Sequence, residues 1–186
     1  MTNDQMFALR PLMLVVALSG SLPAIAQSTK LVVDKDVNVR LSIPKDWESR
    51  SRDRDVFVDC APGKDDSGRP ACYFTIERRK APPDQRTIAD ADREKWKGWT
   101  SASGMRPIIS TRDLKIAGFP AYEVLARSGT GRGDPLQRRV FILVSGTGQV
   151  FDATFLAMGE GKGKGDQYDR YAPAVATALE TLAPAK

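Results

Sequence analysis

The hydrophobic pattern is densest, outside the N-terminal leader, over residues 137–157. Residues 140–144 form an unbroken apolar run rich in β-branched and aromatic side chains, which is typical of a strand covered on both faces. Over residues 151–157, apolar side chains alternate with Asp152 and Thr154, which predicts a neighbouring strand with one solvated face. The Gly-Thr-Gly between them supplies the positive φ that a tight reversal needs. The pattern therefore predicts a β-hairpin at the middle of an antiparallel sheet, paired with the strand expected at residues 121–127.

Weaker patterns of the same kind predict the other elements. Strands are expected at residues 37–43, 56–60, 72–79, 108–114 and 121–127. Residues 27–30 are expected to be a loose terminus, and the mixed-charge segment 50–55 an exposed loop. The order of strands, helix, strands, helix, with hairpin-like links, predicts an α+β fold in which helices pack on an antiparallel β-sheet.

Two helices are expected. The first spans about residues 87–99, with Thr87 and Asp90 as a capping-box-like start. Its two tryptophans could form an aromatic binding platform, although packing against the sheet is the commoner role for such a pair. The second is expected to start near Ala172, because Pro173 is unfavourable in a helix interior. Its apolar face should be aimed at the sheet.

The N-terminal segment has the features of a secretory leader. Arg10 precedes an apolar run over residues 12–22, and a small-x-small site follows at residues 24–26. This predicts a signal peptide over residues 1–26 and a single mature domain over residues 27–186, which is periplasmic or secreted. A membrane anchor is the alternative, but the run is shorter than the ~20 residues that a spanning helix needs. We therefore expect a mature protein that does not span a membrane.

Cys60 and Cys72 are the two cysteines of the chain, and both lie in its exported part. Such pairs usually form a disulfide in an oxidising compartment. Closing the short polar loop between them is worth about 3 kcal/mol in the chain-entropy model. A metal site is the alternative, but two thiols in a chain without histidine make a poor one. We expect neither a metal nor a cofactor.

The charge balance is modestly basic, with 28 Lys and Arg residues against 23 Asp and Glu residues. In an exported protein this suggests an acidic envelope component or an acidic partner protein, and not nucleic acid. The basic residues are spread along the chain, however, which favours ordinary solvated faces. Arg78, Arg79 and Lys80 form one basic cluster, and Arg138 and Arg139 form another. If their strands align, the five side chains would form one positive patch. A solvated edge that discourages sheet-to-sheet aggregation explains them equally well.

Catalytic motifs are scarce. The chain contains no histidine, which excludes Ser-His-Asp and Cys-His nucleophilic sites and histidine-containing metal sites. A carboxylate-dependent hydrolase needs two acids at a fixed separation, and nothing in the pattern places two of Asp53, Asp55, Asp65, Asp66 and Asp152 together. The acids are expected to be solvated loop residues.

Two glycine-containing loops carry short motifs. Residues 159–166, GEGKGKGD, lie between a strand and a helix, but they depart from the phosphate-loop pattern and no Ser or Thr follows to hold magnesium. Lys162 and Lys164 could still attract an anion there. Residues 132–134 spell Arg-Gly-Asp, a tripeptide that often recurs by chance. The first segment is expected to be a flexible loop and the second an exposed loop.

Three stretches together suggest a family. The stretch LSIPKDW resembles the opening strand of PsbP/DcrB/LpqN-type domains, DLKIAGFPAYEV resembles their next strand–turn–strand element, and RRVFILVSGTGQVFDATF resembles the hairpin that follows. The resemblance implies an α-β-α sandwich around an antiparallel sheet, and exported accessory proteins that act as assembly or adaptor subunits and not as enzymes. The loop between Cys60 and Cys72 is not part of the family pattern, so no partner is carried over.

The leading hypothesis from the sequence is therefore an exported, non-enzymatic accessory or binding protein that acts through an envelope protein or an acidic envelope component. Two alternatives stay open. One is a carboxylate-dependent hydrolase of an envelope polymer, and the other is a small-ligand or metal carrier with a groove between helix and sheet.

Overall fold

The computed structural model describes residues 28–60, 72–104, 107–127, 135–157 and 168–185. Two helices are found there, α1 (Asp90–Ala102) and α2 (Tyr168–Glu180). The strands of the described residues are β1 (Thr29–Asp34), β2 (Val39–Pro44), β3 (Glu48–Arg52), β4 (Asp55–Asp59), β5 (Cys72–Lys80), β6 (Ile108–Ile116), β7 (Phe119–Arg127), β8 (Leu136–Val144) and β9 (Gln149–Ala157).

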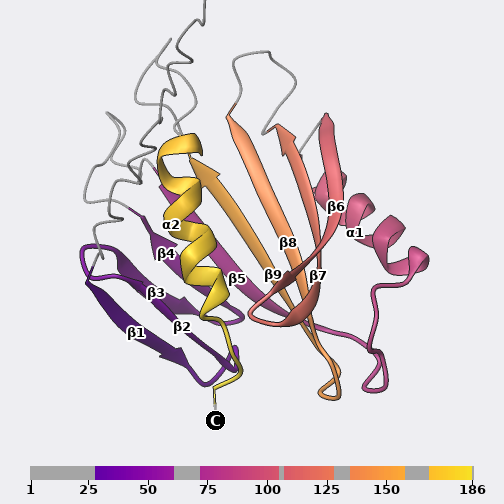
Figure 1. Ribbon diagram of the computed structural model, residues 1–186, viewed down its shortest axis with the longest axis horizontal. Coiled ribbons are helices and arrows are strands. Elements are labelled where there is room, and N and C mark those ends of the chain that lie inside the picture. The colour runs from indigo at the N-terminus through magenta and orange to yellow at the C-terminus, as the bar shows by residue number, and fades with distance from the viewer. Residues whose placement is uncertain (1–27, 61–71, 105–106, 128–134, 158–167, 186) are drawn as a thin grey trace, which may run out of the picture.

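Seven strands form one antiparallel sheet in the order β3-β4-β5-β9-β8-β7-β6, and β1 and β2 form a separate hairpin (Figure 1). This is the predicted α+β fold, with an antiparallel sheet that carries helices. The predicted central hairpin is β8–β9, and β8 pairs with β7 as expected. Gly146 and Gly148 have φ values of 80° and 65° in its turn, the left-handed region that glycine enters without steric cost.

One expectation for this hairpin was wrong. The alternation in β9 predicts a strand with one solvated face, but β9 is covered on both faces and Asp152 is only 2% exposed. The reason is that β9 lies between β5 and β8, with a helix on each side of the sheet. The alternation separates two different buried environments, one apolar and one built from ion pairs.

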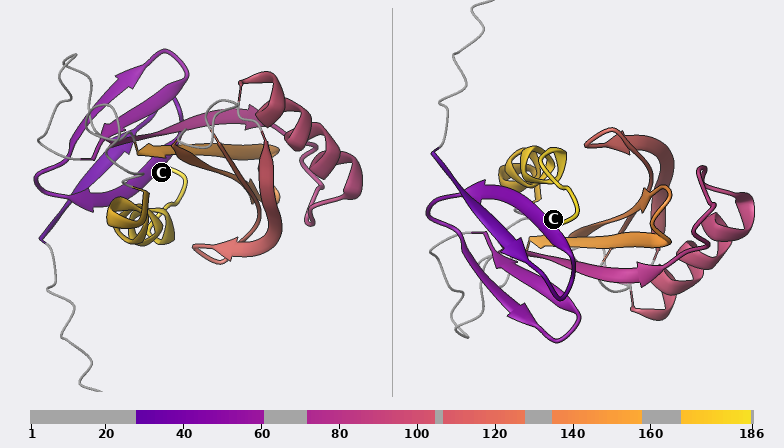
Figure 2. Two further views of the ribbon diagram at one scale, coloured as in Figure 1. Left: turned by 90° about the horizontal axis from the view of Figure 1, so that it is seen from above. Right: turned by 90° about the horizontal axis from the view of Figure 1, so that it is seen from below.

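The two faces of the sheet hold separate apolar clusters, since neighbouring residues of a strand point to opposite faces. The helices lie on opposite sides, so the sheet is the middle layer of the α-β-α sandwich that the resemblance implies (Figure 2). On the α2 side, where β2 also packs, the cluster includes Leu41, Ile43, Phe74, Ile76, Val140, Ile142, Phe151, Phe155, Val175 and Leu179. On the α1 side it consists of Trp96, Tyr122, Val124, Phe141, Leu143 and Val150.

Two strands occur where the sequence predicts irregular chain. The expected loose terminus over residues 27–30 already contains the start of β1, and the expected loop over residues 50–55 contains the end of β3. Both are edge strands, and all five residues of β3 are exposed. Because no buried face imposes an alternation on β3, its sequence carries no hydrophobic signal.

The end of β1 is fixed to β3 by one buried carboxylate. Asp34 accepts hydrogen bonds from the Ser51 hydroxyl and, at 2.8 Å, from the Val37 amide. Burial acts to raise the pKa of Asp34, but these two donors and the Asp36 amide together outweigh it, and the pKa is lowered from the ordinary value of 3.8. The ionised form of Asp34 therefore stabilises this junction.

The helix boundaries also differ from expectation. Helix α1 begins at Asp90 with Ala89 at the N-cap and no side-chain cap, so the capping box of Thr87 and Asp90 does not form. Helix α2 begins at Tyr168 and includes Pro173. Proline at that place removes one intrahelical hydrogen bond near the start of the helix, and its ring is exposed.

The expected signal peptide, residues 1–26, lies outside the described residues and remains a prediction. Among the described residues, neither helix is long and apolar enough to cross a membrane.

Candidate functional site

The five basic residues singled out in the sequence do not share one surface. Strand β9 separates β5, which carries Arg78, Arg79 and Lys80, from β8, which carries Arg138 and Arg139. Neighbouring residues of a strand point to opposite faces, so each cluster is divided between the two sides of the sheet. On β8 both arginines are buried, with 7% and 6% exposure. On β5 the side chains of Arg78 and Lys80 are exposed.

Arg139 lies on the α1 side within a chain of ion pairs. Its Nε donates to Oδ1 of Asp152 at 2.8 Å and its Nη2 to Oδ2 at 2.7 Å. Nε of Arg79 donates to the same Oδ2 at 2.6 Å, and Nη2 of Arg79 donates to Glu77 at 2.8 Å. Two acids and two bases alternate along this chain, so their formal charges cancel. Asp152 is saturated with donors and is not placed to act as a base.

Arg138 lies on the α2 side in a second cluster. Its Nε donates to Oε2 of Glu123, a carboxylate that is only 6% exposed. Arg112 binds the same carboxylate through Nε at 2.7 Å and Nη2 at 3.3 Å, and this hydrogen bonding raises the pKa of Arg112. Burial raises the pKa of the nearby Tyr168 hydroxyl. Both β8 arginines therefore hold strands together across the sheet and offer no open binding surface.

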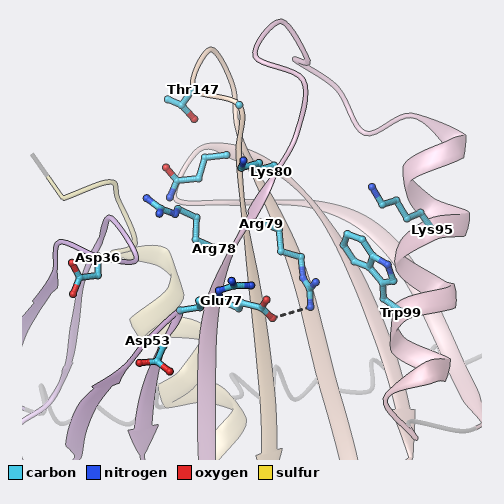
Figure 3. Close-up of a pocket in the computed structure, with 12 residues that line it drawn as sticks. Asp36, Asp53, Glu77, Arg78, Arg79, Lys80, Lys95, Trp99 and Thr147 are labelled. Atoms are coloured by element: carbon cyan, nitrogen blue, oxygen red, sulfur yellow. Dashed lines mark hydrogen bonds and ion pairs between the residues drawn. The ribbon is translucent and has the colours of Figure 1, made fainter.

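The other basic cluster, Arg78, Arg79 and Lys80, lines a cavity with a volume of about 720 Å³ (Figure 3). We call it the basic notch. Five of its side chains are basic and three are acidic. Its lining residues are Asp36, Asp53, Arg54, Glu77, Arg78, Arg79, Lys80, Lys95, Trp99, Thr147, Gly148 and Gln149.

The notch exists because β5 extends beyond the end of its neighbour β4. The register ends with Asp55 of β4 opposite Glu77 of β5, whereas β5 stays paired to β9 as far as Lys80. Beyond that point the described residues place no strand on the β4 side of β5. The β1–β2 turn, with Asp36, and the β3–β4 turn, with Asp53, border the gap (Figure 3).

An aromatic ring forms the far wall of the notch. The guanidinium carbon of Arg79 lies 4.4 Å from the centre of the Trp99 ring, and Nζ of Lys95 lies 4.8 Å from it. Trp99 is half-buried, whereas Trp96 is 3% exposed and stacks on Phe141 at 4.9 Å. The tryptophan pair therefore combines the two roles that the sequence left open: one ring is core, and the other borders a cavity together with two cations.

The carboxylates of the notch do not form a metal site. The described part of the chain contains no group of three histidine, cysteine, aspartate or glutamate residues able to hold an ion. The acids Asp65 and Asp66, the GEGKGKGD loop and the Arg-Gly-Asp tripeptide all lie outside the described residues. Cys60 and Cys72 form a disulfide, with their Cα atoms 5.1 Å apart.

Of the notch residues, Arg78, Arg79 and Lys80 were singled out from the sequence as a basic cluster. Asp53 was named among the candidate acids and Trp99 belongs to the tryptophan pair considered as a platform, whereas the other notch residues were missed. Arg54 lies in the segment that was expected to be an exposed loop, and Lys95 was not singled out. A usable signal existed, because Lys95 and Trp99 are four residues apart and so are neighbours on one helix face. Nothing in the sequence indicates that this face meets the end of β5.

Comparison with known proteins supports the fold. No protein-family model and no curated protein sequence matches the chain. Among solved structures, the Saccharomyces cerevisiae Ran-binding protein Mog1p matches with a TM-score of 0.58 at 7% identity, over 87% of this chain and 97% of Mog1p. Cyanobacterial PsbP (CyanoP) from Synechocystis matches with a TM-score of 0.52 at 17% identity, over 89% of this chain and 98% of CyanoP.

The protein has a PsbP/Mog1-like fold. The resemblance found in the sequence is thereby confirmed at the level of fold. The structure of LpqN, described as involved in cell envelope biogenesis of Mycobacterium tuberculosis, matches less closely, with a TM-score of 0.49 at 14% identity over 86% of this chain and 91% of LpqN.

Proposed function

We propose that this protein is an exported, non-enzymatic binding protein whose basic notch takes up a carboxylate-rich segment of an envelope partner. The observation that carries the proposal is the composition of the notch, a cavity of about 720 Å³ with five basic and three acidic lining residues. A cleft with an excess of one charge attracts groups of the opposite charge and speeds their association. The exposed side chains of Arg78, Lys80 and Lys95 are the groups that would contact the partner.

The chemistry of the notch favours binding over catalysis. Its exposed cations can each donate to a carboxylate, and Arg78 can do so with two parallel N–H groups. Arg79 is committed to Asp152 and Glu77, so it shapes the wall and keeps the Trp99 face in place. Together with Glu77, Asp152 and Arg139, Arg79 belongs to a group with no net formal charge, so the attraction rests on the exposed side chains.

Two further observations support the rest of the proposal. A disulfide between Cys60 and Cys72 suits an oxidising compartment outside the cytoplasm. The fold is also that of Mog1p, which is described as a Ran-binding protein, so this scaffold serves binding in at least one other chain.

The notch can be tested with a fluorescein-labelled oligoglutamate peptide and fluorescence anisotropy. We expect saturable binding that weakens with salt and a loss of at least tenfold in affinity, about 1.4 kcal/mol, in the variant R78E/K80E. The matched control is K45E/K115E, which makes the same charge change at two exposed lysines outside the notch. An equal loss of affinity in both variants would show that net charge alone drives binding, and would refute the proposal that the peptide binds in the notch.

Export has its own test. When the full chain is expressed in a Gram-negative bacterium, N-terminal sequencing of the protein from the periplasmic fraction should give Gln27 as the first residue. Recovery of the uncleaved chain in the cytoplasm would contradict the export part of the proposal and would leave the notch to be judged by the peptide alone.

A further inference from the structure

Strands β1 and β3 are the edge strands of their two sheets, and residues of both line one groove. Strand β1 pairs only with β2, and β3 pairs only with β4, among the residues that the structure describes. Each therefore has one edge without a strand neighbour. Such an edge presents a row of backbone N–H and C=O groups that another strand can pair with.

A groove of about 360 Å³ lies between these two edges. Three consecutive residues from the middle of β3 and four consecutive residues of β1 line the groove, so it runs along the length of both strands. The hydrogen bond from the Ser51 hydroxyl to Asp34 joins the two strands at one end. We call it the β1–β3 groove; its lining residues are Lys30, Leu31, Val32, Val33, Ser49, Arg50, Ser51 and Val56.

The two edges differ in how they are protected. Strand β3 carries charged and hydroxyl side chains, all exposed, which is the usual way to discourage pairing at an edge. Strand β1 instead exposes Leu31 by 64% and Val33 by 51%. These two side chains lie on the same face of the strand, two residues apart. An apolar edge of this kind is a place where a partner strand gains contact area.

We propose that the β1–β3 groove binds an extended segment of a partner protein as an added β-strand, and that this segment alternates apolar with acidic side chains. Its apolar side chains would lie beside Leu31 and Val33. Its acidic side chains would face Lys30, because the lining residues include no acid and the other base, Arg50, already pairs with Asp59 at 3.2 Å. The backbone supplies affinity and the alternating side chains supply specificity.

Charge complementarity selects a different chain over a second copy of this one. The edge of β1 carries Lys30, and its acid, Asp34, is buried and bonded to Ser51 and Val37. Two copies meeting through β1 would bring basic side chains into the same groove without an available carboxylate. An acidic partner strand meets no such repulsion.

The test uses a short labelled peptide of alternating valine and glutamate. Titration into the ¹⁵N-labelled protein should shift the amide signals of β1 and β3 first, and anisotropy should show saturable binding. A peptide with alternate amides N-methylated on its pairing edge and a valine–lysine peptide should each bind at least tenfold more weakly. The first removes the backbone donors and the second reverses the charge.

The matched variants separate this groove from the notch and from general stickiness. L31S/V33S should lose at least tenfold in peptide affinity, while I109S, which alters an apolar residue with 48% exposure on the opposite edge strand β6, should not. R78E/K80E tests the notch and should leave the amide shifts in β1 and β3 in place. Equal binding of the N-methylated peptide, signal changes confined to other strands, or dimerisation that L31S/V33S abolishes would overturn the proposal.

Discussion

The buried carboxylate of Asp152 gives the sharpest test of how this sheet is held together. In the variant D152N the side chain keeps its shape but loses its charge. The Asn oxygen can accept from one arginine, while its amide group is placed against the donors of the other. Arg139, whose side chain is only 7% exposed, is then left without its counter-ion.

The magnitude follows from the burial. Asp152 has a side-chain exposure of 1% and accepts three hydrogen bonds, two from Arg139 and one from Arg79, at 2.6–2.8 Å. Loss of the carboxylate therefore leaves the guanidinium of Arg139 buried without a counter-ion. Breaking a buried pair by removing one partner costs about 3–5 kcal/mol. For a domain of this size that corresponds to a fall of about 6–20 °C in Tm.

The assay is chemical unfolding in urea, followed by circular dichroism, with thermal unfolding as a second measurement. D113N is the control, because Asp113 lies in the same sheet, in β6, and also pairs with an arginine, Arg93. Its side chain is 56% exposed, so that pair should contribute about 0–1 kcal/mol. The difference between the two variants isolates the effect of burial.

A second variant tests the reasoning itself. If an unpaired charge is the cause of the loss, R139M/D152L should be more stable than D152N by at least about 1 kcal/mol, since replacing a whole buried pair by apolar side chains is often neutral. Arg79, with 25% side-chain exposure, keeps Glu77 as its partner. A loss below about 1 kcal/mol in D152N, or a double variant less stable than D152N, would refute the account.

Three further predictions concern local features. D34N should lower the free energy of unfolding, measured in urea, by about 1–3 kcal/mol near pH 7. Because the folded pKa of Asp34 is lowered, the difference between wild type and D34N should persist at pH values above the unfolded pKa of 3.8. It should shrink as the pH falls through the folded pKa. C60A/C72A should lose about 3 kcal/mol from the free energy of unfolding through the opened loop, and reduction of the wild type should mimic it. G148A places a Cβ 3.0 Å from a backbone oxygen at a φ of +65° and should lower the free energy of unfolding by about 1–3 kcal/mol. The control G98A, in α1, places a Cβ with nothing within 4 Å and should leave the Tm unchanged or raise it. Thermal unfolding of both variants checks this.

The sequence predicts the centre of the sheet better than its rim. The run over residues 140–144 indicates burial on both faces, and β8 is buried on both faces. The partner strand β7 and the disulfide could also be predicted from the sequence, because both follow from patterns local to the chain. Strands β1 and β3 were missed because their outer positions face solvent, and exposed strand residues carry no periodic hydrophobic signal.

The charged residues were the hardest to interpret. Arg138 and Asp152 both look like solvent-facing residues in a linear pattern, and both are buried. Their partners Glu123, Arg139 and Arg79 lie 15, 13 and 73 residues away in sequence and meet them only through the strand register. Composition cannot distinguish a basic patch from two internal ion-pair clusters, because the distinction depends on which face of which strand each side chain occupies. The strand register determines which of the two arrangements forms.

The same register places the two proposed binding surfaces next to each other. Strands β1 and β3 form the walls of the groove, and the chain that leaves their C-terminal ends supplies Asp36, Asp53 and Arg54 to the notch. Both features have a common origin, because the β1–β2 hairpin is not hydrogen-bonded to the large sheet as a strand neighbour and β4 stops short of the end of β5. The hydrogen bond between Ser51 and Asp34 joins β1 and β3 at the end of the groove that faces the notch, so an extended segment in the groove ends before the notch. The alternating acids required by the groove and the carboxylates required by the notch are therefore separate requirements, and each is tested with its own peptide.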